Sequence, residues 1–141
     1  MVISKIKALR KISVVLVLMF SFSLFAPFAS AEGSPYIGSY TASITAGSNG
    51  SVTVWFQITG LGTLDEIGAI SVTIYENGTL VKTYTHTNTS GMMGYNTFIH
   101  GSSITYAGTA GKNYYSYVTY QAGKNGLWDN RGMMTNTVTA K

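Results

Sequence analysis

The 141-residue chain contains no cysteine. This absence excludes disulfides, thiolate metal sites, cysteine nucleophiles and lipid attachment to an N-terminal cysteine. Charged residues are also scarce, at 10% of the chain, and the only histidines are His86 and His100. No Ser-His-Asp arrangement is visible around either histidine, so the composition favours a non-catalytic protein that is held together by packing. We expect no cofactor and no metal ion.

The few charges are unevenly distributed. Four basic residues stand near the start of the chain and equal its whole formal charge of +4: Lys5, Lys7, Arg10 and Lys11. From Glu32 onward, five acidic and five basic residues balance. Nucleic-acid binding rests on a basic footprint that neutralises phosphates. We therefore expect no nucleic-acid partner for residues 32–141.

The first 31 residues have the three-part layout of a secretory signal peptide. A basic start is followed by an apolar run from Val14 to Ala26 and by the small residues Ala29-Ser30-Ala31. We predict a signal helix that is cleaved after Ala31, and a secreted domain, residues 32–141, that is free or loosely held at the cell wall and has no membrane segment. A retained anchor is the alternative, because the uncharged stretch 12–31 is long enough to cross a bilayer.

Residues 32–141 show the period of two that is typical of half-buried strands. Residues 51–59 place Val52, Val54, Phe56 and Ile58 on one face and polar residues on the other. Asn77-Gly78 is a two-residue turn signal and predicts a hairpin of 68–76 with 79–86. Further strands are expected at four ranges: 36–46, 96–106, 113–122 and 133–140. We predict an all-β fold, an antiparallel two-sheet sandwich of about seven strands, with a closed barrel as the alternative.

The C-terminal part of the chain, from Gly111 to Ala140, resembles the last two strands of a fibronectin type III or bacterial immunoglobulin-like domain. In such domains, a tyrosine near the start of the penultimate strand closes a corner by bonding to the backbone. Tyr114 is the candidate for this tyrosine, since it shares a face with Ser116, Val118 and Tyr120.

Seven short motifs are spread over most of the chain beyond the leader: Asp65-Glu66-Ile67-Gly68-Ala69, Lys82-Thr83-Tyr84-Thr85, Gly91-Met92-Met93-Gly94-Tyr95-Asn96-Thr97, Gly111-Lys112, Tyr114-Tyr115, Ala122-Gly123-Lys124-Asn125-Gly126 and Thr135-Asn136-Thr137-Val138. In these motifs the chain is similar to an uncharacterised family of small secreted proteins from Gram-positive bacteria. The resemblance implies export and fold. It implies no activity and no functional residue.

Aromatic residues are the best candidates for ligand contact, because the chain has ten tyrosines and two tryptophans. Sugar rings stack on exposed aromatic faces, and peptide-binding loops use the same residue types. Trp55 points away from the apolar row of 52–58, and Trp128 falls in a predicted loop over 123–132. We predict ligand contacts at Trp128, its neighbours Asp129 and Arg131, and Trp55.

The carboxylates support an alternative reading. Asp65, Glu66 or Asp129, with or without a histidine, would serve a secreted hydrolase or hold a cation. Asp65 and Glu66 are adjacent, however, and adjacent residues of a strand point to opposite faces. The leading hypothesis is therefore a non-catalytic extracellular module that binds envelope polysaccharide, a peptide or another protein. A secreted hydrolase and a toxin-like antimicrobial protein are the alternatives.

Overall fold

The computed structural model describes residues 33–141, so the predicted signal segment lies outside the described residues. The described part contains seven strands: β1 (Ile37–Ala46), β2 (Ser51–Glu76), β3 (Thr79–Thr85), β4 (Met93–Ala107), β5 (Asn113–Lys124), β6 (Leu127–Met134) and β7 (Val138–Thr139). It contains no helix, which confirms the all-β prediction. Accordingly, residues 33–141 include no helix of the length and hydropathy needed to cross a membrane.

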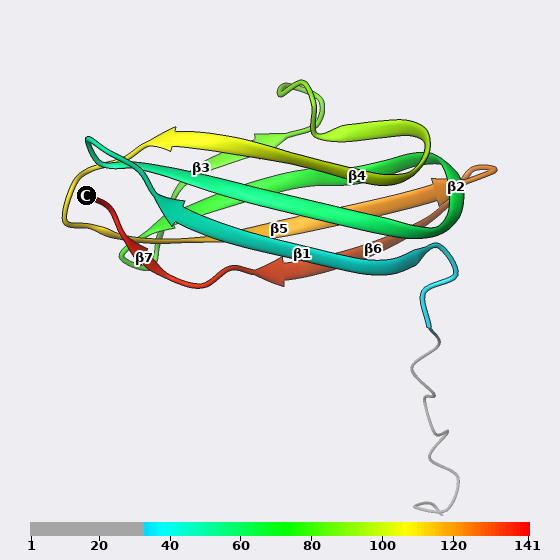
Figure 1. The fold of residues 1–141 in the computed structure, drawn as a ribbon, viewed down its shortest axis with the longest axis horizontal. Coiled ribbons are helices and arrows are strands. Elements are labelled where there is room, and N and C mark those ends of the chain that lie inside the picture. Colours follow the sequence, from blue (N-terminus) through cyan, green and yellow to red (C-terminus); the bar gives the residue numbers. More distant parts are fainter. Residues whose placement is uncertain (1–32) are drawn as a thin grey trace, which may run out of the picture. The chain divides into compact units, whose positions relative to one another are not determined.

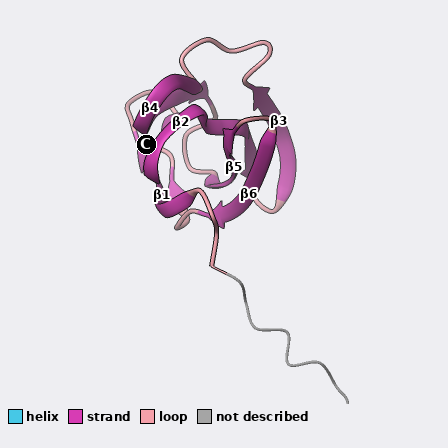
Figure 2. Ribbon diagram, turned by 90° about the vertical axis from the view of Figure 1, so that its right-hand side faces the viewer, coloured by secondary structure: helices cyan, strands magenta, loops and turns pink. Residues whose placement is uncertain are grey.

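All seven strands belong to one antiparallel hydrogen-bonded sheet that is organised around β2. The first half of β2 pairs with β1 and with the end of β4, and its second half pairs with β5, with β3 and, over Leu64–Gly68, with the start of β4 (Figure 1). On its other side, β5 pairs with β6 and β7. Seen end-on, the strands surround a common interior (Figure 2). The sheet is therefore sandwich-like. We call β1, the first half of β2 and the end of β4 the first layer, and the second half of β2 with β3, β5 and β6 the second layer.

The bend between the layers corrects one sequence prediction. Residues 51–59 and 68–76 were expected to form separate strands, but β2 continues from one to the other through Gly60 to Gly62. The register with β4 shifts between Thr59 and Leu64, which leaves four residues of β2 unpaired on that side. Extra residues of this kind bend a strand without ending it, and glycine tolerates the bend. Two expected strands are consequently one.

Two Asn-Gly turns define the hairpins of the second layer. Asn77 and Gly78 connect β2 to β3 with φ values of 47° and 85°, as the sequence predicted. Asn125 and Gly126 connect β5 to β6 with φ values of 54° and 75°. Paired left-handed residues are what a tight two-residue hairpin turn needs. The second turn leads directly into β6, so the expected loop over 123–132 is wrong: most of it is strand.

The interior is built from the inward rows of the long strands. Val52, Val54, Phe56 and Ile58 of β2 are all fully buried, as predicted. The inward row of β5 is also fully buried: Tyr114, Ser116, Val118, Tyr120 and Ala122. Because β5 belongs to the opposite layer, this packing fixes β5 and turns its other row of side chains outward.

Two buried tyrosines hold the layers and loops together. Tyr114 accepts the backbone N–H of Thr109 at 2.8 Å and donates to Glu76, which confirms the predicted tyrosine corner. Tyr120 donates to the backbone carbonyl of Thr41 in β1 at 2.5 Å. Burial raises the pKa of both phenols above the ordinary value of 10.0, with Glu76 adding to the effect on Tyr114. Both hydroxyls are therefore kept neutral where they are needed as donors.

Candidate functional site

The indole of Trp128 covers part of β5 on the outer surface of the second layer. It is opposite Gly123 in the β5–β6 register, and its neighbour in sequence, Asp129, is opposite the buried Ala122. A Cβ atom on Gly123 would overlap Cε3 and Cζ3 of the indole and would lie 2.8 Å from Cδ2. The ring therefore rests directly on the backbone of β5, and Gly123 is buried beneath it. The other side of the ring is open, since Trp128 is 48% exposed.

A second aromatic ring repeats this arrangement further along the hairpin. Tyr117 of β5 points outward, and its phenol lies over Gly132 of β6. A Cβ atom on Gly132 would overlap the phenol oxygen and would lie 3.2 Å from Cε1. Tyr117 is 40% exposed. The indole of Trp128 thus covers Gly123, the hydroxyl end of Tyr117 lies over Gly132, and both side chains remain partly exposed to solvent.

A pair of tyrosines stands at the far end of the same surface. Tyr75 of β2 and Tyr115 of β5 face each other across the ladder, with ring centroids 4.8 Å apart and planes 7° from parallel. Because their separation matches the spacing of neighbouring strands, the two rings stand upright on the sheet. We call the surface that carries Trp128, Tyr117, Tyr115 and Tyr75 the aromatic face.

The aromatic face is polar but almost uncharged. Between the rings of Trp128 and Tyr117, the outward side chains of β5 and β6 are Thr119, Gln121 and Asn130. No side chain of the outward rows from Asn113 to Gly123 and from Trp128 to Met134 carries a charge, and the exposed Lys124 at the end of β5 directs its ammonium to the backbone oxygen of Thr63. Glu66 of β2 is the nearest ionisable group in the register, because it is paired with Gly123 on one side and with the exposed Tyr95 on the other. The face therefore offers flat rings, neutral hydrogen-bonding groups and one carboxylate.

Asp129 and Arg131 lie on the other side of β6 from Trp128. The Arg131 guanidinium donates to Asp129 at 2.7 Å. The second oxygen of Asp129 accepts the hydroxyl of Ser34, which in turn accepts the backbone N–H of Ile37 at 2.7 Å. The side chain of Asp129 is only 11% exposed. These two predicted contact residues therefore join the entry to β1 to the edge strand β6, and the structure does not bring them to the aromatic face.

Trp55 is the centre of a second, flatter surface on the first layer. It is 40% exposed and lies between Ser43 of β1 and Ser103 of β4. Two residues before Trp55 on β2, the hydroxyl of Thr53 is hydrogen-bonded to that of Thr105 on β4 at 2.9 Å. No glycine lies opposite Trp55 in either neighbouring strand. Trp55 therefore stands among hydroxyl groups and has no cross-strand glycine beneath its ring. We call such a glycine, as Gly123 is for Trp128, a glycine bed.

Asp65 and the two histidines, which a hydrolase would need, have structural partners. Asp65 accepts the backbone N–H of Asn125 at 2.7 Å, at the turn that begins β6. The ring of His100 bonds to the backbone oxygen of Gly91 at 2.9 Å, and that of His86 lies 3.4 Å from the oxygen of Ile70. Among residues 33–141, no group of three or more acidic or histidine side chains has the arrangement of a metal site.

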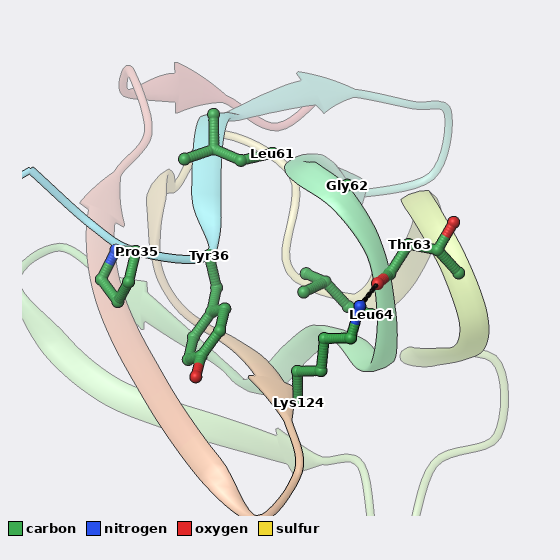
Figure 3. Close-up of a pocket in the computed structure, with 7 residues that line it drawn as sticks. All are labelled: Pro35, Tyr36, Leu61, Gly62, Thr63, Leu64 and Lys124. Atoms are coloured by element: carbon green, nitrogen blue, oxygen red, sulfur yellow. Dashed lines mark hydrogen bonds between the residues drawn. The ribbon is translucent and has the colours of Figure 1, made fainter.

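The described residues also form a small pocket near the bend of β2 (Figure 3). Its volume is about 190 Å³ and its walls include Tyr36, Leu64 and Lys124. The ammonium of Lys124 donates to the backbone oxygen of Thr63 at 3.1 Å and crosses one side of the pocket. Pockets for drug-sized ligands usually measure 300–1,000 Å³. This pocket is smaller, so the aromatic face is the better candidate for ligand contact.

Sequence reasoning found Trp128 by residue type but missed Tyr117 and both glycine beds. The signal was present in the hairpin register. Once Asn125-Gly126 is taken as a two-residue turn, Gly123 must lie opposite Trp128, and Gly132 lies two rungs from Tyr117. An aromatic residue that covers a cross-strand glycine is a recognised stabilising pair in sheets.

Comparisons of the chain with protein-family models, with curated proteins and with solved structures gave no match.

Proposed function

We propose that this protein is an exported, non-catalytic binding module that holds extracellular glycan, such as a cell-envelope polysaccharide, by stacking sugar rings on its aromatic face. The observation that carries the proposal is the indole of Trp128, which is fixed on one side by the backbone of β5 and open on the other. Flat aromatic rings offer large apolar area with little side-chain entropy to lose. The ring is already in place, so binding costs little reorganisation.

The surroundings of Trp128 favour a sugar over other ligands. Sugar hydroxyls both donate and accept hydrogen bonds, and the Thr, Gln and Asn side chains of the aromatic face do the same. The lack of basic side chains on the outer rows of β5 and β6 disfavours nucleic acid, which depends on phosphate neutralisation. Export of the module, predicted from residues 1–31, would bring it to the polysaccharides of the cell envelope.

The proposal is tested by co-sedimentation of the purified protein with insoluble glycans. The panel is cellulose, chitin, xylan, mannan and peptidoglycan sacculi, and the variants are Trp128→Ala and Trp55→Ala. Trp55→Ala is the matched control, because Trp55 has similar exposure but lies on the other layer. We expect binding to at least one polymer that is lost in Trp128→Ala and kept in Trp55→Ala. Equal retention of both variants, or no binding to any polymer, would contradict the proposal.

The same two tryptophans give an independent optical readout. A Trp55→Phe variant leaves Trp128 as the one tryptophan of the chain, and Trp128→Phe leaves Trp55. A sugar that stacks on Trp128 should remove water from its open side and shift its emission to shorter wavelength. The emission of Trp55 in the Trp128→Phe protein should not move when the same oligosaccharide is added.

A further inference from the structure

We infer that the aromatic face binds a linear, neutral polysaccharide that runs along β5 and occupies two stacking positions, Trp128 and Tyr117. This inference rests on the proposed function and specifies its ligand class. The two rings lie on the same hairpin and on the same side of the sheet; the indole of Trp128 covers Gly123, and the hydroxyl end of Tyr117 lies over Gly132. Both are partly exposed on this side, so one ligand can contact both.

The spacing of the rings sets the length of chain that engages both. Gly123, beneath Trp128, and Thr119, which is opposite the glycine beneath Tyr117, are four residues apart on β5. At about 3.3 Å per residue, the two positions are about 13 Å apart. A disaccharide that stacks on one ring falls short of the other. A longer unbranched chain reaches both without leaving the surface.

The residues between and beyond the rings fit such a chain. Thr119, Gln121 and Asn130 lie between the two stacking positions and supply neutral donors and acceptors. The upright Tyr75 and Tyr115 rings mark the far end of the face. Along β5, the distance from Tyr115 to Gly123 is about 26 Å at 3.3 Å per residue. The aromatic face is thus an open, elongated surface, the two-position track, that suits a chain of several sugars. A single sugar would need an enclosed pocket instead.

Charge selects between classes of polysaccharide. Phosphate-rich or uronate-rich polymers are usually held by arginine or lysine. The outward rows from Asn113 to Gly123 and from Trp128 to Met134 hold neither, the ammonium of Lys124 is bonded to the backbone oxygen of Thr63, and the Glu66 carboxylate is paired in register with Gly123. An anionic chain would be repelled at the Trp128 end. A neutral chain would find a hydrogen-bond acceptor there.

The test is titration of the purified protein with cello-, chito-, xylo- and manno-oligosaccharides from disaccharide to hexasaccharide. We expect affinity for one series to rise by about tenfold once the chain spans both rings, which corresponds to one stacking contact. Tyr117→Ala should remove this rise and keep the affinity for the disaccharide. Trp128→Ala should weaken every length. Trp55→Ala is the control and should change neither. If Tyr117→Ala fails to fold, Tyr117→Thr makes the same test with a strand-forming residue.

The possible outcomes separate the two proposals. Affinity that does not depend on chain length, but is lost in Trp128→Ala, overturns the two-position track and leaves glycan binding standing. Binding of an anionic polymer that weakens steeply with salt overturns the neutral class. Binding of no glycan, together with capture of an extracellular protein through Trp128, overturns both proposals.

Discussion

Replacement of Gly123 by alanine tests the geometry on which the site depends. The added methyl group would overlap two carbons of the Trp128 indole, so the ring must lift from the backbone of β5. Trp128 is 48% exposed, and about half of a surface of roughly 250 Å² is therefore covered. At 25 cal/mol per Å², this cover is worth about 3 kcal/mol. We expect the methyl group to remove about half of this stabilisation.

The net effect should be smaller than this loss. Alanine restricts the unfolded chain more than glycine does, which returns roughly 0.4–1 kcal/mol. We therefore predict that Gly123→Ala lowers the free energy of unfolding by about 1 kcal/mol, or a few degrees in Tm for a domain of this size. In a Trp55→Phe background, the emission of Trp128 should move to longer wavelength as the covered side of the indole becomes wet.

Gly62→Ala is the matched control for this substitution. A Cβ atom on Gly62 meets nothing within 4 Å, and Gly62 has no positive φ angle. Its Tm and emission should match those of the parent protein or show slight stabilisation. If Gly123→Ala and Gly62→Ala have the same Tm and the same Trp128 emission, the indole does not rest on Gly123 and the reasoning is wrong.

Three further predictions concern the scaffold. Val54→Asp should lower the free energy of unfolding by roughly 3–5 kcal/mol because it places an unpaired carboxylate in the interior, whereas Thr53→Asp, on the outer face, should have a mild effect; thermal melts compare the two. Tyr114→Phe should cost about 1–3 kcal/mol in chemical denaturation, since it leaves a backbone N–H and a carboxylate without their partner. Stability should fall as pH rises above about 10, because the unfolded tyrosines lose their protons before the buried Tyr120 does, and Tyr120→Phe should flatten this fall in melts between pH 9 and 12.

The interior was predictable because burial in a strand repeats every second residue. Val52 to Ile58 alternate cleanly, and the row is fully buried. The Asn77-Gly78 hairpin and the corner at Tyr114 were also found, since each depends on a residue type that few alternatives replace. The bend at Gly60 to Gly62 was not found. Glycine marks an interruption, but the sequence does not say whether the hydrogen-bonded ladder stops or continues through it.

Strand β6 was missed because the middle of its inward row is polar. Asp129 and Arg131 pair with each other, and Asp129 also bonds to Ser34 at the entry to β1, so the apolar alternation that reveals a strand is interrupted. Asp129 and Arg131 were grouped with Trp128 because they are close to it in sequence. In a strand, residues one or three positions apart point to opposite faces. Tyr117, which is distant in sequence, instead lies on the same face as Trp128.

The two glycine beds explain why a stable sheet can carry exposed rings on this hairpin. Glycine weakens a strand because it has no side chain to pack, and Gly123 and Gly132 both lie on outward positions of the pair. An aromatic ring that covers such a glycine restores the lost packing and is held flat by it. Packing stability explains the covered side of each ring. Threonine or valine at the two glycine and the two aromatic positions would pack as well and would expose less apolar area. The open sides of Trp128 and Tyr117 are what packing leaves unexplained, and they are the part that a ligand would cover.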